Sequence, residues 1–144
     1  MHRLTLAAAS TIVDEALAKA RQDSLQPMCV VVLDAGGHVL VTKREETASL
    51  LRPQIATAKA AGALGMGMGS RAIAQRAAQS PTFYNAVFAI SAGGMAPSPG
   101  GVLIRNDAGE IIGAVGVSGD KPDADEAIAL SGIAAAGLLA DPGA

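Results

Sequence analysis

The sequence predicts an α+β fold in which helices pack on a mainly antiparallel β-sheet. Residues 28–43 and 100–119 each form a pair of apolar stretches joined by a turn rich in Asp, Asn and Gly, which is typical of a β-hairpin. The remaining segments carry the 3.6-residue apolar spacing of helices. Hairpins pair strands antiparallel, whereas parallel strands need long crossovers. We therefore expect one α+β domain over residues 1–144.

The second arm of the later hairpin, residues 111–118, is expected to be the central strand. One face would carry Ile111, Gly113, Val115 and Val117, and the other Ile112, Ala114, Gly116 and Ser118. A strand with one wet face alternates apolar with polar residues, so this strand should be covered on both sides. Its two glycines indicate close packing against helices or a ligand.

The first half of the chain gives clear helix signals. Thr5 is expected to cap a helix that ends near Gln22. Pro53 suits the first turn of a second helix. The glycine run at residues 65–69 should end that helix, and Ser70 should cap a short third one.

The second half is less regular. Residues 81–90 fit either a helical turn or a short strand, and the glycines and prolines of residues 91–100 predict a mobile loop. Asp123 is expected to cap the last helix, with Glu126 at the capping-box position. Residues 141–143 are expected to fray.

Composition limits the classes of function. The chain has 144 residues, half of them apolar, and a formal net charge of −2 without a basic patch, which argues against nucleic acid or an anionic membrane as partner. No apolar run approaches the roughly 18 residues of a membrane span. The N-terminus lacks a signal pattern and the single cysteine predicts no disulfide, so we expect a cytoplasmic protein.

Few residues offer chemistry on their own. His38 is the only histidine away from the N-terminus and suits an iron, but a half-exposed histidine after a turn is also ordinary structure. Cys29 would need a basic partner to act as a nucleophile, and its apolar neighbours favour a core thiol. The glycines of residues 65–69 follow a helix and lack the lysine of a phosphate-binding loop.

Four segments of the chain stand out together: VVVLDAGGHVLVTKRE, IATAKAAGA, GGVLIRNDAGEIIGAVGVSG and DADEAIALSGI. In this order they resemble the GlcG/HbpS family, whose domain also forms the C-terminal part of PduO cobalamin adenosyltransferases, and the resemblance covers roughly residues 4–139. It implies a profilin-like five-stranded sheet flanked by helices, assembly into dimers or larger rings, and haem or corrinoid association in some members. Residues 44–48 and 100–104 depart from the usual family motifs.

The family pattern places cations at Arg44 and Lys59, each where a strand end and a helix should approach one another. Such cations can hold a carboxylate, either a haem propionate or a small organic acid. The alternative is an ion pair with Glu45, Glu46 or Asp125.

The aromatic residues also cluster. Phe83 and Tyr84 precede the glycine-rich loop that contains Gly94 and Met95, so they could form a stacking wall and lid for a flat ligand. They could equally form a contact between subunits.

Three classes of function follow. The resemblance favours a protein that binds haem or another carboxylate-bearing small molecule, with His38 on the iron and the backbone of Gly100 and Gly101 as further donors. The alternatives are a small catabolic enzyme (an isomerase or hydrolase acting on an organic acid or ring-cleavage product), in which Glu46 or Asp125 moves a proton, and an assembly module. A homo-oligomer is expected, both from the resemblance and because the helices do not obviously cover both faces of the central strand.

Overall fold

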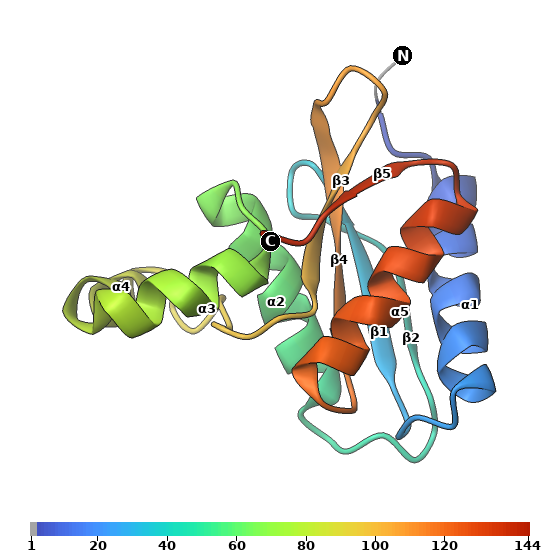
Figure 1. The fold of residues 1–144 in the computed structure, drawn as a ribbon, viewed down its shortest axis with the longest axis horizontal. Helices are drawn as coiled ribbons and strands as arrows, with labels where there is room; N and C mark the ends of the chain where they lie inside the picture. Colours follow the sequence, from blue (N-terminus) through green and yellow to red (C-terminus); the bar gives the residue numbers. More distant parts are fainter. Residues whose placement is uncertain (1–2) are drawn as a thin grey trace.

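The computed structural model describes residues 3–144 and confirms the α+β fold, with an entirely antiparallel five-stranded sheet (Figure 1). In chain order the elements are α1 (Leu6–Gln22), β1 (Cys29–Asp34), β2 (Val39–Arg44), α2 (Arg52–Met66), α3 (Ser70–Gln79), α4 (Pro81–Ile90), β3 (Gly101–Arg105), β4 (Ile111–Ser118), α5 (Pro122–Ala135) and β5 (Leu139–Asp141). No helix among these is long and apolar enough to cross a membrane.

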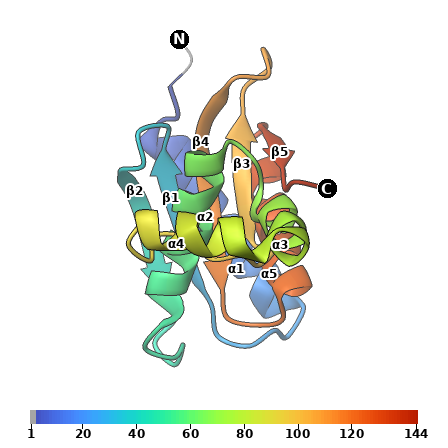
Figure 2. The same ribbon diagram turned by 90° about the vertical axis from the view of Figure 1, so that its left-hand side faces the viewer.

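The sheet has the strand order β2-β1-β4-β3-β5, so β4 lies at its centre as expected. Helices α1 and α5 cover one face and α2 covers the other, while α3 and α4 extend away from the sheet on the α2 side (Figures 1 and 2). Both faces of β4 are therefore covered by helices of the same chain. The expectation that this strand needs a second subunit to cover it is wrong.

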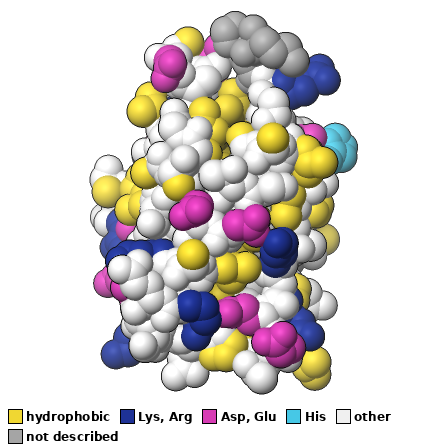
Figure 3. Space-filling model, turned by 90° about the vertical axis from the view of Figure 1, so that its right-hand side faces the viewer, with side chains coloured by type: hydrophobic (Ala, Val, Ile, Leu, Met, Phe, Trp, Pro, Cys, Tyr) yellow, Lys and Arg dark blue, Asp and Glu magenta, His cyan; other side chains and the backbone are white. Residues whose placement is uncertain are grey.

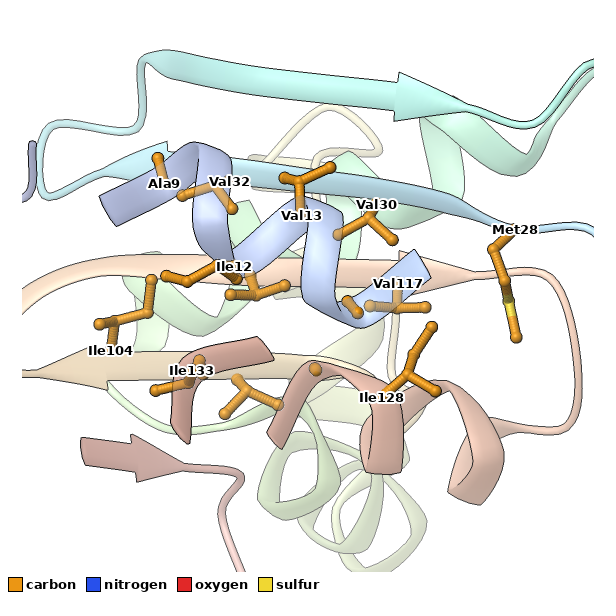
Figure 4. Packing of buried hydrophobic residues seen from close by; sticks show 14 of the residues in the cluster. Ala9, Ile12, Val13, Met28, Val30, Val32, Ile104, Val117, Ile128 and Ile133 are labelled. Carbon is orange, nitrogen blue, oxygen red and sulfur yellow. The ribbon is translucent and has the colours of Figure 1, made fainter. Parts of the chain in front are cut away.

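The larger part of the core lies between the sheet and the pair α1 and α5 (Figure 4). Branched side chains from both helices meet those of β1, β3 and β4, and each buried Val or Ile contributes about 1.5–3 kcal/mol. The labelled members are Ala9, Ile12, Val13, Met28, Val30, Val32, Ile104, Val117, Ile128 and Ile133. Because aromatic residues are scarce, packing depends on aliphatic side chains at close range.

Small residues hold α2 against the opposite face. Ala56, Ala60 and Ala63 of the helix pack on Ala114 and its neighbours in the sheet. Gly116 of β4 lies directly under the helix, where an added Cβ atom would overlap the carbonyl oxygen of Ala56. The close packing predicted from this glycine is confirmed.

One part of the prediction for the two faces of β4 is wrong. The pairing of β3 with β4 shifts register between Ile104 and Arg105. Ile112 consequently joins the cluster under α1 and α5, and Ile111 packs against the cluster under α2. The shift reverses the faces predicted for these two residues, because an irregular position breaks the strict alternation of a strand.

The helix starts are partly as predicted. Thr5 caps α1, since its hydroxyl oxygen accepts the Ala8 N–H at 3.1 Å. Gly69, rather than Ser70, occupies the N-cap of α3. Lys121 precedes α5, so Asp123 lies inside the first turn and makes no capping hydrogen bond. Glu126 binds Arg71 instead of completing a capping box.

The ambiguous and terminal segments are now assigned. Residues 81–90 form the helix α4, and residues 91–100 have no regular structure. The predicted fraying at the C-terminus is wrong, because β5 pairs with β3 and Asp141 forms an ion pair with Arg105 at 3.0 Å. Gly69 leaves room for the C-terminal segment beside the start of α3, since a Cβ atom at this position would overlap the backbone of Pro142.

We expect Gly116→Ala to destabilise the protein by about 3 kcal/mol, because the clash is with the backbone of α2 and overpacking has costs of that order. Gly65→Ala is the matched control, since Gly65 lies in α2 with nothing within 4 Å of an added Cβ atom. That variant should gain about 0.5–1 kcal/mol of helix stability. Urea unfolding followed by circular dichroism measures both, and equal stabilities would contradict the packing described.

Candidate functional site

Lys59, one of the predicted ligand-binding cations, lies in the interior of the domain. Its side chain is 3% exposed, and its Nζ donates to Asp125 Oδ2 at 3.1 Å and to the Val117 carbonyl at 2.9 Å. Asp125 is 1% exposed, and its other oxygen accepts the Asp120 N–H at 2.8 Å. Of the two alternatives predicted for Lys59, a ligand contact or an ion pair, the structure therefore contains the ion pair, and both side chains are shielded from solvent.

Burial acts on both members of this pair. It lowers the pKa of Lys59 and raises the pKa of Asp125, because a dry environment disfavours each charged form. The opposite charge and the backbone hydrogen bonds offset part of that cost. Asp125 thus belongs to a buried structural pair, whereas the proton transfer considered from the sequence needs a carboxylate that a substrate can contact.

Gly100 and Gly101 form the covering over Lys59. Gly100 has φ +122°, and a Cβ atom there would lie 2.9 Å from Lys59 Nζ, so only glycine fits without displacement. The Gly101 N–H donates to Ser70 Oγ at 2.7 Å, and Ser70 donates to the Ser98 carbonyl at 2.6 Å. The Gly101 N–H expected to face a ligand is therefore used to fasten β3.

Arg44, the second predicted cation, closes the loop that follows β2. Its Nη1 donates to the carbonyl oxygens of Glu45, Glu46 and Ala48 at 3.2, 3.0 and 3.0 Å. The Glu46 residue is exposed. Within the described residues no hydrogen bond or ion pair joins Arg44 to Lys59, so the structure does not combine them into one carboxylate site.

The aromatic cluster is real but lies apart from the loop glycines. Tyr84 is buried and contacts Phe83 edge to face at 5.3 Å between ring centroids, while Phe83 is 60% exposed. Together with polar residues of α3 these two rings border a hollow of 500 Å³. Met95 packs instead against Gly62 of α2.

Gly94 lines a separate hollow of 340 Å³ on the outer face of α2, bordered by Pro53, Thr57, Ala58 and Ala61 among others. Its size falls within the roughly 300–1,000 Å³ of small-molecule sites. The hollow lacks any imidazole, thiol or cation in its lining. The predicted wall and lid therefore belong to two different surfaces.

His38 stands on the turn between β1 and β2, held by Asp34. One oxygen of Asp34 accepts the Gly36 N–H at 2.9 Å and the His38 N–H at 3.0 Å, and lies 3.3 Å from His38 Nδ1. Hydrogen bonding, first from the His38 backbone, lowers the pKa of Asp34, so this carboxylate is ionised and can only accept. In the tautomer with its proton on Nδ1, His38 donates to this carboxylate and Nε2 carries the lone pair.

The surroundings of this imidazole form a hollow of 320 Å³. Arg3, Gly36 and Ile112 border it together with His38. An added Cβ atom at Gly36 would come within 3.0 Å of the ring, so the glycine lets the imidazole lie flat on the turn. Arg3 forms no ion pair within residues 3–144. Arg3 could not be identified from the sequence, because nothing before the first helix predicts that this residue meets the hairpin.

Cys29 is a buried thiol. Burial raises its pKa, and its Sγ lies 3.9 Å from Thr42 Oγ1. This environment fits the core thiol and lacks the base that a nucleophile needs. Among the described residues no three metal-ligating side chains of the His, Cys, Asp or Glu type come together.

Acidic and basic side chains are interspersed over the face formed by α1 and α5 (Figure 3).

Fold and site together define a small α+β domain with surface hollows of small-molecule size. The chain belongs to the HbpS-like family: the family model described as "haem degrading protein HbpS-like" matches residues 4–134. This match confirms the GlcG/HbpS resemblance. No curated protein matches the chain.

Solved structures agree. The PduOC–heme complex is 27% identical with a TM-score of 0.86, covering 95% of this chain and 97% of that chain. HbpS is 31% identical with a TM-score of 0.80, covering 92% and 89%. ORFY from Klebsiella pneumoniae is 25% identical with a TM-score of 0.85, covering 94% and 92%. One of these relatives was therefore solved with heme.

We expect Lys59→Met and Asp125→Asn each to destabilise the protein by about 3–5 kcal/mol, because each leaves a buried partner unpaired. The double variant should cost clearly less than the sum. Lys43→Met is the control, since its 2.7 Å pair with Asp14 is half exposed and should contribute about 0–1 kcal/mol. If urea unfolding gave Lys59→Met the same mild effect as the control, Lys59 would again be available to a ligand.

Proposed function

We propose that this protein binds haem at the hollow beside the β1–β2 turn, with His38 as the ligand to iron. The observation that carries the proposal is the imidazole itself: Asp34 holds its Nδ1, which leaves Nε2 directed away from the carboxylate. Metal-ligating histidines characteristically have such a partner on the other ring nitrogen. The HbpS-like family and the PduOC–heme relative support haem as the ligand.

The residues of the hollow fit the chemistry of haem. Haem supplies a flat apolar ring, carboxylate side chains and an iron that accepts imidazole nitrogen. Arg3, which forms no ion pair within residues 3–144, offers a guanidinium for a carboxylate, the strongest kind of hydrogen-bonded contact available to it. Ile112 gives the hollow an apolar floor, and the exposed Leu6 and Val39 belong to the elements on either side.

The other surfaces fit haem less well. The hollow on α2 has apolar walls but no side chain that binds iron. The buried Lys59 and Asp125 pair cannot reach a carboxylate outside the domain. The catabolic-enzyme alternative gains no support here, because Asp125 is enclosed and the exposed Glu46 has no partner base or acid in the described contacts.

A haemin titration followed by absorbance tests the proposal. His38→Ala should shift the Soret band and weaken affinity at least tenfold, about 1.4 kcal/mol. Arg3→Gln should weaken binding with the band unchanged, because it removes a carboxylate contact and not the iron ligand. Arg76→Gln, on the distant α3, is the control. Native affinity and an unchanged spectrum in His38→Ala would overturn the assignment.

We further propose that the chain is a homo-oligomer, with α4 in the contact. This helix extends from the body of the domain (Figure 1), and its Phe83 and Ile90 side chains are 60% and 83% exposed. Apolar side chains exposed at that level on one projecting helix are typical of an interface.

Light scattering should give a mass of at least a dimer for the native protein at micromolar concentration. Phe83→Glu combined with Ile90→Glu should shift it to the monomer, because burying an unpaired carboxylate is strongly unfavourable. Leu139→Glu, an equally drastic change at an exposed position on β5, should leave the mass unchanged. A monomeric native protein would contradict the proposal.

A further inference from the structure

We infer that the chain carries a second site, which binds the carboxylate of a small organic acid through Arg52. Arg52 begins α2 and borders a hollow of 340 Å³ with the loop after β2, the segment before β1 and Gly119. This hollow is distinct from the one at His38, so the inference stands or falls independently of haem binding.

The contacts of Arg52 leave most of its binding capacity unused. Its Nε donates to Ser49 Oγ at 3.2 Å and its Nη1 donates to Ser118 Oγ at 3.1 Å. A guanidinium has five N–H donors, so three remain, which suffices for a two-point contact with a carboxylate. Both partners are neutral hydroxyls, and no carboxylate within residues 3–144 forms an ion pair with Arg52.

The two serines fix the guanidinium instead of neutralising it. Ser118 is fully buried at the end of β4, the central strand of the sheet. Ser49 lies three residues earlier on the loop, and its carbonyl accepts the Arg52 N–H at 3.1 Å. The side chain is therefore anchored at both ends, which lowers the entropy that a ligand would otherwise have to remove.

The acidic groups near this hollow are already committed. Asp120 accepts the Gln26 N–H at 2.8 Å with one oxygen and the Lys121 N–H at 2.7 Å with the other. Asp125 pairs with Lys59 in the interior. The negative charge of Asp120 acts on Arg52 and offsets part of its positive charge, but the two side chains form no ion pair within residues 3–144. The N–H groups of Arg52 that bind neither serine are therefore left for a ligand.

The lining selects the kind of anion. Thr47 and Ser49 add hydroxyls on one side, while Pro27 and Ala48 add apolar surface. A volume of 340 Å³ exceeds what a single phosphate or sulfate ion fills and lies at the lower end of the range for small-molecule sites, roughly 300–1,000 Å³. One cation beside mixed polar and apolar surface fits a small carboxylic acid with a short carbon chain.

Nuclear magnetic resonance of the ¹⁵N-labelled full chain tests the site with succinate as probe. We expect a saturable shift of the Arg52 Nε–H and of the amides of residues 47–49 and 119. Dimethyl succinate, the neutral ester, should cause none. Arg52→Gln should weaken binding at least tenfold, and Arg76→Gln should leave it unchanged. If Arg52→Gln does not fold, Thr47→Val takes its place, with a weaker but measurable loss.

Three results would overturn the inference. One is the absence of a saturable shift at about 10 mM succinate, tenfold above a 1 mM dissociation constant. Another is equal binding by the native protein and Arg52→Gln. The last is tighter binding of inorganic phosphate than of succinate, which would assign the hollow to phosphates.

Discussion

The direct contact between α2 and the sheet constrains much of what surrounds it. The carbonyl of Ala56 lies over Gly116, and the carbonyl of Lys59 lies over Gly101, in both cases where a side chain would overlap the helix backbone. At this separation Lys59 has no room to bend outward. Its ammonium enters the layer between helix and sheet, and a charge in that layer is tolerable only with Asp125 and the Val117 carbonyl as partners.

This contact also explains why the cations expected to bind a ligand do not form one site. Lys59 is used to join α2, β4 and the start of α5, and Gly100 covers it with a conformation that favours glycine. Arg44 stabilises three carbonyl groups of its own loop. The cations of the two proposed sites, Arg3 and Arg52, form no ion pair within residues 3–144.

The sequence predicted the layers well, because hairpin turns and helix periods are local signals. It missed β5, since three residues of mixed polarity carry no strand pattern and form a strand only beside β3. It reversed Ile111 and Ile112, because an irregular register cannot be read from alternation. For Lys59 it left two alternatives, a ligand contact and an ion pair. The close approach of α2 to the sheet decides between them, because it buries the side chain. Arg3 and Arg52 could not be recognised as candidate binding residues, because the residues that surround them in the structure lie far away in the sequence.

The two proposed ligand sites lie at opposite ends of β2. His38 directly precedes this strand, and the loop that borders the Arg52 hollow follows it. Six extended residues span roughly 20 Å at about 3.3 Å each, so ligands at the two ends cannot touch. Coupling would require an element with two arrangements between them, whereas β1, the strand that links both ends, is fully packed along Cys29–Leu33. We therefore expect ligands at the two proposed sites to bind independently of one another.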